Sequence, residues 1–434
     1  MSQHTGSAQR VEAMARTLRR EIGRYSARRP GSVAPATTLV VVGGIHGNEP
    51  AGWHAAQRVL DTLSREQPSA FDGTLVALLG NLAAINHPRP DTRYIEHDLN
   101  RLFTDEQIAL SADTSPEHEQ MQELLASLRS IRARAERMVL IDLHTTSAEA
   151  PPMVVMEDAI PTRRLARKLP LPIYLGFEEE LGGLLMDRVT GELGANAMVI
   201  EGGQHDDPNA VDVHEAVIWC MLDACGVLPL DAIAHRHDPG VLLHRAAGEE
   251  RGMVFDIRFR RGIRDSDFRI CQGIEHGSRA KQETTLIAVE RGETIAAPIS
   301  GLVFMPNMQP RKRPGDDGFF IVRRVGEGWL GLSARLRRQR WLHWVIAHMP
   351  GVYQRDERTL FVDADLAAVL RRQILHLLGY RLVRYDQRRG GHGLARVYKG
   401  FTAFTRALLR GPIPGGPNPN DPRFWIVRRH ALDE

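Results

Sequence analysis

Between residues 37 and 237, short apolar runs alternate with longer stretches in which apolar residues recur at helical spacing. Five runs are expected to form buried strands: Thr38–Gly43, Gly73–Leu79, Met138–Leu143, Met153–Met156 and Ala197–Ile200. Three stretches are expected to form helices: Pro50–Leu63, Pro116–Ala135 and Val211–Cys225. Strands that alternate with helices predict an α/β fold with a mixed, mostly parallel, helix-covered sheet.

The pattern changes after residue 237. From about Asp238 the helical spacing stops, and short apolar runs between Gly and Pro residues predict a small all-β domain that ends near Val325. Its strands are expected at Val254–Phe259, Thr285–Val289, Glu293–Ala296, Leu302–Met305 and Phe319–Val322. Beyond Gly331 we expect an α-containing segment with a helix at Asp365–Leu378 and an irregular stretch at Gly411–Pro422.

The first 36 residues differ from the region that follows them. Val11–Tyr25 suits an amphipathic helix, and the Pro and Gly residues of Arg28–Ala36 indicate a linker. A chain of 434 residues is also long for a single domain. We therefore expect four units: an N-terminal helix and linker (1–36), an α/β domain (37–237), a β domain (238–330) and an accessory segment (331–434).

Charge is distributed unevenly along the chain, whose formal net charge is +3. Residues 331–434 hold 19 Lys and Arg against 8 Asp and Glu, a net charge of +11, and the preceding residues carry −8. Such a segment can mark an interaction tail for nucleic acid, anionic lipid or an acidic partner. Arg is the ordinary cation throughout this chain, however, and no recognised nucleic-acid-binding module is visible. We therefore do not expect a nucleic-acid partner.

The sequence bears on compartment and partners in three further ways. It has no run of 18 apolar residues, so we expect no membrane-spanning helix. Met1–Pro30 is polar and lacks the apolar core of a signal peptide, which favours a cytoplasmic protein. Cys220, Cys225 and Cys271 form no C-x-x-C pair and are expected to be reduced thiols. The oligomeric state stays open, with a homo-oligomer among the options.

Two histidines and one glutamate follow two of the predicted strands. His46 and Glu49 form an H-x-x-E motif after Thr38–Gly43, and His144 follows Met138–Leu143. Ligands gather at the carboxyl ends of strands in such sheets, and zinc used for hydrolysis takes three protein ligands and leaves one position for water. We therefore predict one zinc ion per chain, held by His46, Glu49 and His144. An H-x-x-E pair alone is weak evidence, because a Glu at that place also complements a helix dipole.

Other residues near these motifs could support or replace the ligands. Asp142 precedes His144 by two residues and is a natural carboxylate partner for its ring. Five further histidines are alternative ligands, although each is more readily explained as a surface residue or as a support of the site: His54, His87, His97, His205 and His214.

The charged loop Arg93–Phe103 has the composition of a carboxylate-binding site. Arg93 and Arg101 can each form a forked, two-bond contact with a carboxylate, and Asn100 adds a polar group. Asp98 could orient Arg101 or Asn100. A solvated surface loop would have a similar composition, so this loop carries weight only together with the metal motif.

Glu201 ends the predicted strand Ala197–Ile200 and is followed by two glycines. A carboxylate at a strand end near the metal could act as a general base, which takes a proton from water and later delivers it to the leaving amine. The alternative is an ordinary acidic residue that caps the next helix.

Four motifs occur in one order along the chain: Gly43–Glu49, Arg93–Phe103, Asp142–Thr146 and Ile200–Gly203. Together they resemble the aspartoacylase/succinylglutamate desuccinylase family, a branch of the zinc carboxypeptidase-like hydrolases. Arg93–Arg101 is especially similar to aspartoacylases, and Gly292–Pro306 is similar to the β domain of the family. The resemblance covers roughly residues 37 to 325, and the segment after Gly331 has no counterpart that we recognise.

The resemblance implies roles for five of the residues. His46, Glu49 and His144 match the zinc ligands of the family, and Glu201 matches its general base. Arg93 matches an arginine that polarises the scissile carbonyl and stabilises the tetrahedral oxyanion.

The resemblance is less complete for substrate binding. Asn100 and Arg101 match groups that hold the substrate's carboxylate. The family has another arginine shortly before the catalytic Glu, and Arg188 is the nearest candidate here, at a different spacing. The family also uses a tyrosine from its β domain, but this chain has no Tyr between Tyr174 and Tyr353. That departure argues against N-acetylaspartate itself as the substrate.

Taken together, these residues predict a zinc-dependent hydrolase that removes an acyl group from an N-acyl amino acid or a similar small anionic carboxylate. An ester would pass through the same steps as an amide. Two alternatives stay open: a zinc carboxypeptidase that acts on peptides, and a catalytically silent binding protein of the same fold.

Overall fold

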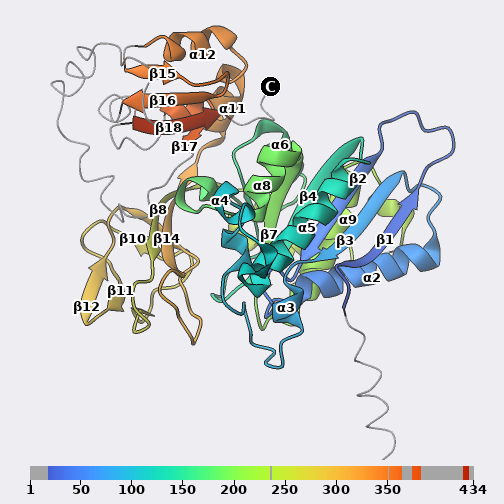
Figure 1. Ribbon diagram of the computed structural model, residues 1–434, viewed down its shortest axis with the longest axis horizontal. Coiled ribbons are helices and arrows are strands. Elements are labelled where there is room, and N and C mark those ends of the chain that lie inside the picture. Colours follow the sequence, from blue (N-terminus) through green and yellow to red (C-terminus); the bar gives the residue numbers. More distant parts are fainter. Residues whose placement is uncertain (1–17, 235–236, 350, 364–373, 383–423, 430–434) are drawn as a thin grey trace, which may run out of the picture.

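A mixed sheet of eleven strands runs through the described part of the chain (Figure 1). The computed structural model describes residues 18–234, 237–349, 351–363, 374–382 and 424–429. In sheet order the strands are β1 (Glu21–Ala27), β3 (Gly73–Leu79), β2 (Thr37–Gly43), β4 (Arg137–Thr146), β7 (Asn196–Gln204), β5 (Met153–Met156), β6 (Ile173–Leu175), β8 (Val254–Gly262), β14 (Asp317–Val325), β13 (Gly301–Phe304) and β10 (Arg279–Ala280).

The centre of this sheet is parallel. β2 pairs in parallel with β3 and with β4, and β4 pairs in parallel with β7, so the carboxyl ends of these four strands meet at one edge. All seven residues of β2 are buried because helices cover both faces of the sheet. A strand that is covered on both faces reads as a continuous apolar run, which is why β2, β3 and β4 were visible in the sequence.

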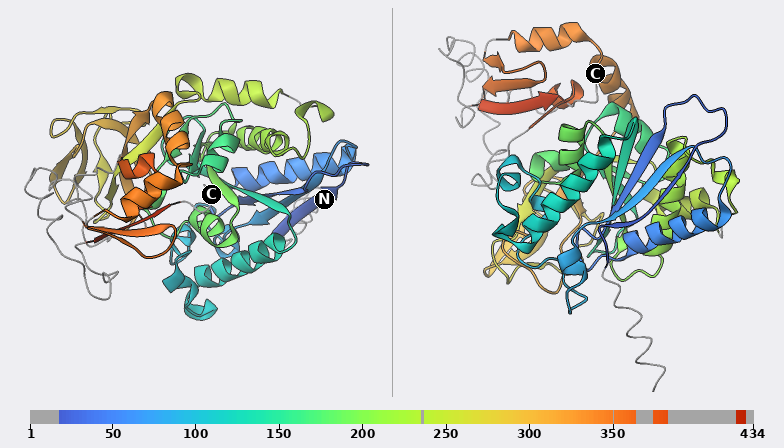
Figure 2. Two further views of the ribbon diagram at one scale, coloured as in Figure 1. Left: turned by 90° about the horizontal axis from the view of Figure 1, so that it is seen from above. Right: turned by 45° about the vertical axis from the view of Figure 1, so that its right-hand side comes forward.

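Helices flank the sheet on both sides. α2 (Ala51–Glu66), α9 (Ala210–Ala224) and α10 (Pro239–Ala246) pack together on one face, and α5 (Pro116–Arg132) lies on the opposite face (Figure 2). The shorter helices are α3 (Leu82–Ile85), α4 (Asp105–Ile108), α6 (Ile160–Ala166), α7 (Phe177–Glu180), α8 (Leu185–Leu193) and four 3₁₀ turns, η1 (Leu99–Arg101), η2 (Ala112–Thr114), η3 (Leu230–Ala232) and η4 (Gly248–Glu250). The expected mixed, helix-covered α/β fold is therefore confirmed.

The β region does not stand apart from this sheet. β8 pairs in parallel with β6 and antiparallel with β14, so the large sheet continues from the α/β region into the β region. A three-stranded sheet packs beside it, in the order β12 (Glu293–Ala296), β11 (Leu286–Glu290) and β9 (Arg269–Ile270). Tyr174 of β6 stacks on Phe255 and Phe304 at the point where the two regions meet.

The C-terminal segment adds a second compact body (Figure 1). Its helices are α11 (Glu327–Leu336) and α12 (Arg340–Ala347). Its antiparallel sheet has the order β15 (Val352–Gln354), β16 (Thr359–Asp363), β18 (Phe424–Arg429) and β17 (Tyr380–Leu382). The segment has its own apolar cluster, which includes Ile346, Leu360 and Val362. The division of the chain at residues 36, 237 and 330 stays a prediction.

A buried ion network joins this segment to the α/β region. The Asp158 carboxylate, which follows β5, accepts hydrogen bonds from Arg163, from Arg337 at 2.5 Å and from Arg381 at 2.6 Å. Arg337 also donates to the backbone oxygen of Asp158 at 2.6 Å. Burial alone would raise the pKa of the Asp158 carboxyl, but the three arginines outweigh it and hold that pKa well below its usual range.

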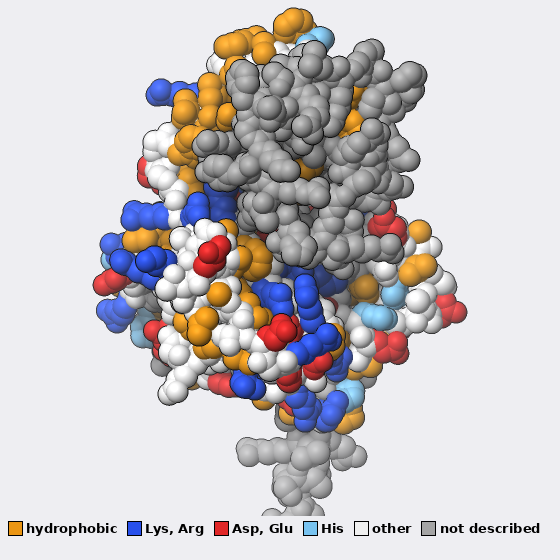
Figure 3. All heavy atoms as spheres, turned by 90° about the vertical axis from the view of Figure 1, so that its left-hand side faces the viewer, with side chains coloured by type: hydrophobic (Ala, Val, Ile, Leu, Met, Phe, Trp, Pro, Cys, Tyr) orange, Lys and Arg blue, Asp and Glu red, His pale blue; other side chains and the backbone are white. Residues whose placement is uncertain are grey.

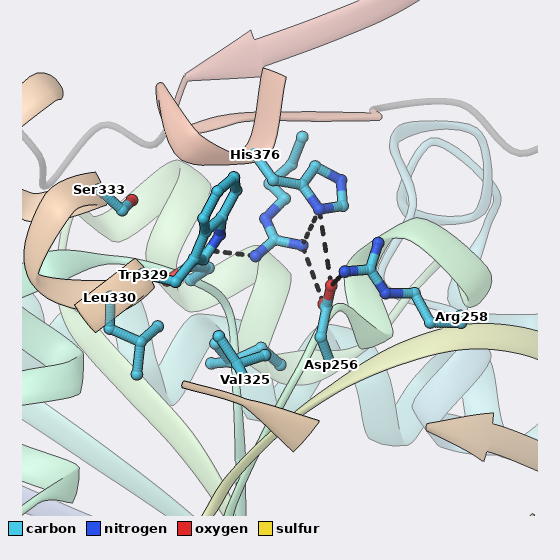
Figure 4. A pocket seen from close by; sticks show the side chains of 10 residues that line it. Asp256, Arg258, Val325, Trp329, Leu330, Ser333 and His376 are labelled. Carbon is cyan, nitrogen blue, oxygen red and sulfur yellow. Dashed lines mark hydrogen bonds and ion pairs between the residues drawn. The ribbon is translucent and has the colours of Figure 1, made fainter. Parts of the chain in front are cut away.

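A second carboxylate extends the network (Figure 4). Asp256 of β8 lies 3.3 Å from Arg381, 2.8 Å from Arg258 and 3.6 Å from Nδ1 of His376. The cavity among these side chains measures about 20 Å³, which is room for about one water molecule. The junction is therefore filled by paired charges, and we assign it a structural role.

Asp158→Asn is expected to destabilise the junction strongly. The change leaves three buried guanidinium groups without their shared carboxylate, and breaking a buried ion pair on one side costs about 3–5 kcal/mol. Thermal unfolding should show a clearly lower midpoint. Glu327→Gln is the matched control, because its ion pair with Arg167 also joins the two parts at 2.6 Å but is exposed and contributes about 0–1 kcal/mol. Equal midpoints for the two variants would contradict the assigned role.

Most predicted elements are confirmed. The strands expected between residues 37 and 237 are all present, with ends that differ by a few residues, and so are the three helices. Ser115 caps α5 by accepting a hydrogen bond from the backbone N–H of His118. Cys220, Cys225 and Cys271 are free thiols. Among the described helices, none is long and apolar enough to cross a membrane.

The N-terminal helix was wrongly predicted over its described part. Residues from Glu21 form β1, which pairs antiparallel with β3. Without β1 the backbone groups along that edge of β3 would lack partners, and this tertiary demand overrides the local helical pattern. Gly23 makes room for the packing, since a Cβ there would lie 2.9 Å from Cδ1 of Leu60 in α2. Residues 11–17 of the predicted helix lie outside the described residues.

The expectation that helices stop after Asp238 is also wrong, because α10 follows directly. Asp238 caps α10 by accepting from the backbone N–H of Val241, and Pro239 occupies its first position. Both are ordinary helix-start signals that the sequence contained. The predicted helix Asp365–Leu378 falls outside the described residues except for its last few residues, and the stretch Gly411–Pro422 falls wholly outside them.

Candidate metal centre

Four of the predicted site residues come together at the carboxyl ends of β2, β4 and β7. His46 and Glu49 lie in the loop between β2 and α2, and His144 lies near the end of β4. Glu201 lies on β7, where the strand register places it directly beside His144. The parallel pairing of these strands is what gathers residues that are far apart in the sequence.

Two glycines let the backbone close tightly around this point. A Cβ on Gly52, at the start of α2, would lie 2.5 Å from Cβ of Leu143, so glycine allows α2 to begin directly against β4. A Cβ on Gly47 would lie 2.6 Å from the backbone oxygen of Thr92. The Gly47 N–H also donates to the backbone oxygen of Arg93 at 2.9 Å, which brings the Arg93 loop to the H-x-x-E loop.

His46, Glu49 and His144 form a compact group of three potential ligands. Nδ1 of His46 lies 3.0 Å from one carboxylate oxygen of Glu49, and Nδ1 of His144 lies 3.0 Å from the other. One ligand atom from each of the three residues lies within 4.8 Å of the others, and all three side chains are buried. Two imidazole nitrogens and one carboxylate form a donor set that suits zinc.

The remaining ring nitrogens face supporting carboxylates. Nε2 of His144 lies 3.0 Å from Asp142, and Nε2 of His46 lies 3.1 Å from Asp98. A histidine ligand commonly uses its second nitrogen in this way, which fixes the ring and directs the first nitrogen to the metal. The buried Nδ1 of His46 makes no well-aligned hydrogen bond with any described residue. The three residues therefore fit a zinc ion.

The electrostatics of the group also favour a cation. Burial alone would raise the pKa of Glu49, but His46 and His144 lower it well below its usual range. Burial alone would lower the pKa of His144, but Asp142 and Glu49 raise it well above its usual range. Three carboxylates, those of Glu49, Asp98 and Asp142, thus surround two imidazoles, and a bound divalent cation would offset their charge.

Arg93 lies at the rim of this group. It donates to Glu49 at 2.8 Å, lies 2.9 Å from Nε2 of His46 and lies 3.6 Å from Asp98. Its side chain is 25% exposed, whereas that of Glu49 is 2% exposed. A substrate that arrives from solvent can therefore reach the guanidinium while the ligands beneath stay enclosed.

Glu201 has the environment of a residue that exchanges protons. It is buried, and its Oε2 forms no hydrogen bond with any described residue. Burial raises the pKa of Glu201 to about 7, although the charges of His144 and other neighbours act on it as well. A carboxyl group whose pKa lies near neutrality can both accept and release a proton.

The predicted substrate-binding residues have other partners in this structure. Oδ1 of Asn100 accepts from the backbone N–H of Leu185 at 2.8 Å, and the Arg101 guanidinium donates to Asp317 at 2.7 Å. Arg188 is not among the residues brought together here. Its guanidinium contacts Asp105 in α4 and Glu192 in its own helix, each at 2.5 Å.

Two carboxylates that support the site have partners that the sequence did not predict. Glu117 in α5 is fully buried and accepts from the backbone N–H groups of residues 95, 96 and 97 at 2.7–3.2 Å, so it holds the loop that carries Arg93. Asp98 was expected to orient Arg101 or Asn100, and it does accept a hydrogen bond from the backbone N–H of Asn100 at 2.9 Å. The same carboxylate oxygen also lies 3.1 Å from Nε2 of His46, a contact that the sequence did not indicate. The sequence shows that both residues are acidic and that a charged loop is present, but it does not show that these acids are buried against that loop.

The β region reaches the same loop. Tyr94 donates to Asp316 at 3.1 Å, and the guanidinium of Arg313 lies 4.5 Å above its ring. Asp317 also accepts from Arg260 at 2.5 Å, so one carboxylate lies between Arg101 and Arg260. The segment before β14 thus borders the Arg93 loop.

Comparison with known proteins shows a match between the region of this site and a family model. Residues 35–218 match the sequence model of the succinylglutamate desuccinylase/aspartoacylase catalytic domain. The matched range contains every residue of the candidate centre described above from His46 to Glu201. The resemblance that the four motifs indicated is thereby confirmed.

Relatives of the succinylglutamate desuccinylase/aspartoacylase domain include curated enzymes. An N-acyl-aromatic-L-amino acid amidohydrolase (carboxylate-forming) of Xenopus laevis is 32% identical over 114 residues, 26% of this chain and 36% of that protein. The protein of the same description from Rattus norvegicus is 33% identical over 130 residues, 30% of this chain and 39% of that protein. The chain thus spans little more than a third of the length of these relatives.

A solved structure extends the likeness in fold. The crystal structure of succinylglutamate desuccinylase from Vibrio cholerae has a TM-score of 0.51 and 16% sequence identity, and it covers 71% of this chain and 93% of that chain. At this identity the comparison concerns the fold alone. It agrees with an α/β sheet that continues into a β region.

Proposed function

We propose that this protein is a zinc-dependent hydrolase that removes the acyl group from an N-acyl amino acid or a similar small carboxylate. The observation that carries the proposal is the convergence of the His46, Glu49 and His144 ligand atoms within 4.8 Å, with Glu201 on the strand next to His144. The descriptions of the curated relatives as N-acyl-amino acid amidohydrolases support the substrate class.

The residues of the chain have complementary parts in this reaction. Zinc, when bound by His46, Glu49 and His144, supplies Lewis acidity and lowers the pKa of water. Glu201 accepts a proton from the attacking water as its oxygen adds to the acyl carbon. Glu201 then returns the proton to the amine nitrogen as the C–N bond breaks, which yields a carboxylate and a free amine.

Arg93 is suited to stabilise the charge that develops during this step. Its N–H groups lie at the exposed rim of the ligand group and already contact Glu49. A donor that is fixed before the reaction stabilises a developing oxyanion without the cost of reorganising solvent. Glu117 contributes indirectly, because it fixes the backbone that carries Arg93.

The surroundings favour a small substrate over a peptide. Asp316 and Asp317 of the β region contact Tyr94 and Arg101, so a part of the chain outside the matched domain borders the site on that side. A substrate carboxylate would bind Arg101 together with Asp317 or in place of Asp317. A zinc carboxypeptidase would need room for a peptide to extend past these contacts.

A hydrolysis screen tests the proposal. Zinc-loaded protein is offered N-acetyl and N-succinyl amino acids, including aromatic ones, with short peptides as controls. We expect the protein to release carboxylate from N-acyl amino acids and to cleave peptides very little. Peptide turnover without deacylation would favour the carboxypeptidase alternative. Zinc binding without any turnover across the screen would favour a catalytically silent binding protein.

Arg101→Ala is expected to weaken substrate binding and to change turnover much less. Loss of one charge-assisted hydrogen bond corresponds to about 1.5–3 kcal/mol, which predicts a KM increase of roughly 10- to 100-fold for carboxylate-bearing substrates. Arg188→Ala is the matched control, since Arg188 is held by Asp105 and Glu192. If the two variants have the same KM as the unchanged protein, Arg101 does not bind the substrate's carboxylate.

A further inference from the structure

The outer helix of the C-terminal segment presents its apolar residues to solvent. α12 buries His343 and Ile346 against its own segment, while Trp341 and Trp344 are each 62% exposed and Val345 is 42% exposed. Residues that are three and four positions apart lie on the same face of a helix. Single exposed apolar residues are common, but two tryptophans and a valine on one helical face form a continuous apolar surface.

Three arginines precede this surface in the chain, and the sequence around it has no acidic residue. Between Glu327 and Asp356 the chain has no Asp or Glu. Arg335, Arg338 and Arg340 are exposed at the corner where α11 leads into α12, and none of them forms an ion pair with another described residue. We call the six residues Trp341, Trp344, Val345, Arg335, Arg338 and Arg340 the α12 surface.

The α12 surface lies at an extremity of the molecule. Figure 1 shows α12 at the outer edge of the C-terminal segment, away from the large sheet. In Figure 3, hydrophobic side chains gather along the upper end of this segment. A flat partner could therefore approach the helix without meeting the rest of the described molecule.

This combination of residues matches the chemistry of an anionic phospholipid surface. The tryptophan ring has an apolar body and a polar N–H, and it prefers the boundary between lipid tails and headgroups. Arginine binds phosphate through a fork of two N–H groups. An interfacial helix combines these features by inserting its apolar face shallowly while nearby cations meet the headgroups.

Two other occupants fit less well. Single-stranded nucleic acid is bound along basic grooves with aromatic platforms, whereas α12 is a convex helix whose face includes the aliphatic Val345. A second copy of the chain would bring Arg335, Arg338 and their symmetry mates together, because both partners of a two-fold interface use the same surface. Three apolar side chains also provide much less than the roughly 800 Å² per partner of a stable interface.

We propose that the α12 surface docks this protein on bilayers that contain anionic phospholipid. Trp341 and Trp344 enter the headgroup boundary, and Arg335, Arg338 and Arg340 contact the phosphates. The docking is peripheral and does not involve a membrane-spanning helix. It is also independent of the proposed hydrolysis, because none of these residues belongs to the metal centre.

Sedimentation with vesicles tests the proposal on the full chain. Vesicles contain either phosphatidylcholine alone or equal parts of phosphatidylcholine and phosphatidylglycerol. The unchanged protein should sediment with the mixed vesicles, and added salt should release it. The double variant W341A/W344A should bind at least about tenfold more weakly, because it loses most of the apolar area that can enter the interface. R335Q/R338Q/R340Q should lose the preference for phosphatidylglycerol.

Controls separate docking from damage to the fold. Val241→Ala removes another exposed apolar side chain, 56% exposed on α10, and should bind as the unchanged protein does. All variants should unfold at the same temperature as the unchanged protein and retain any hydrolysis measured without vesicles. Vesicle binding by W341A/W344A equal to that of the unchanged protein would overturn the proposal. So would an absence of binding by the unchanged protein, a change of oligomeric state in W341A/W344A, or a tryptophan-dependent preference for a single-stranded oligonucleotide over vesicles.

Discussion

His144→Ala is expected to abolish zinc binding and hydrolysis together. The change removes one of three donors that lie within 4.8 Å of one another, and it leaves Glu49 without the ring that contacts one of its oxygens at 3.0 Å. Even the loss of a supporting hydrogen bond lowers metal affinity by roughly 10- to 100-fold, and the loss of a ligand should exceed this. Zinc content per chain after dialysis measures the first effect directly.

Thermal unfolding provides a second test of the His144→Ala variant. A ligand that binds only the folded state stabilises it in proportion to the logarithm of its concentration. Zinc should therefore raise the unfolding temperature of the unchanged protein and leave that of His144→Ala unaffected. His54→Ala is the control, because His54 is exposed on α2 beside Trp53. Zinc retention by His144→Ala, or zinc loss by His54→Ala, would show that the ligands are assigned wrongly.

The centre of the site could be anticipated from the sequence because simple rules place it. β2 and β4 are mostly apolar runs, and a polar residue that follows such a run lies at the carboxyl end of a buried strand. His46, Glu49 and His144 could therefore be grouped without knowledge of the strand order. Glu201 also follows an apolar run and could be placed at a strand end in the same way. The parallel register of β4 and β7 places it beside His144.

The parts that could not be anticipated depend on contacts between distant segments. Asp98 contacts His46 across 52 positions in the chain, and nothing local distinguishes this partner from Arg101. Glu117 was visible as an acidic residue at a helix start, but its bonds to three backbone N–H groups depend on how α5 lies against the loop. A sequence pattern reports local periodicity and cannot report which surfaces meet.

The same limit explains the errors in the fold. β1 was misread as helix because its strand character comes from pairing with the edge of β3. The junction at Asp158 was not foreseen because its arginines come from α6, from the residue that ends α11 and from β17, which lie far apart in the sequence. The sequence showed the excess of arginine after residue 331 only as a net positive charge. Among the described residues, these arginines include members of buried ion pairs, such as Arg337 and Arg381, and exposed groups beside α12.

Glu201→Gln is expected to retain zinc and to lose turnover. The amide has nearly the shape of the carboxylate, and Glu201 is not one of the three grouped ligands. The amide of the variant cannot accept a proton from water, however, and a general acid–base group contributes roughly 10²- to 10⁴-fold to rate. We therefore expect kcat to fall by about 10³-fold with little change in KM, measured on whichever N-acyl amino acid the screen identifies.

The combination of unchanged zinc content and lost turnover separates a proton-transfer role from a metal-binding role. If Glu201→Gln loses zinc as His144→Ala does, Glu201 acts as a ligand, and another group must move the proton. If it keeps near-normal kcat, Glu201 is not the general base. Glu192→Gln is the matched control, because Glu192 pairs with Arg129 at the surface and its loss should leave kcat and zinc content unchanged. A large fall in kcat for both variants would instead indicate a general response to lost negative charge.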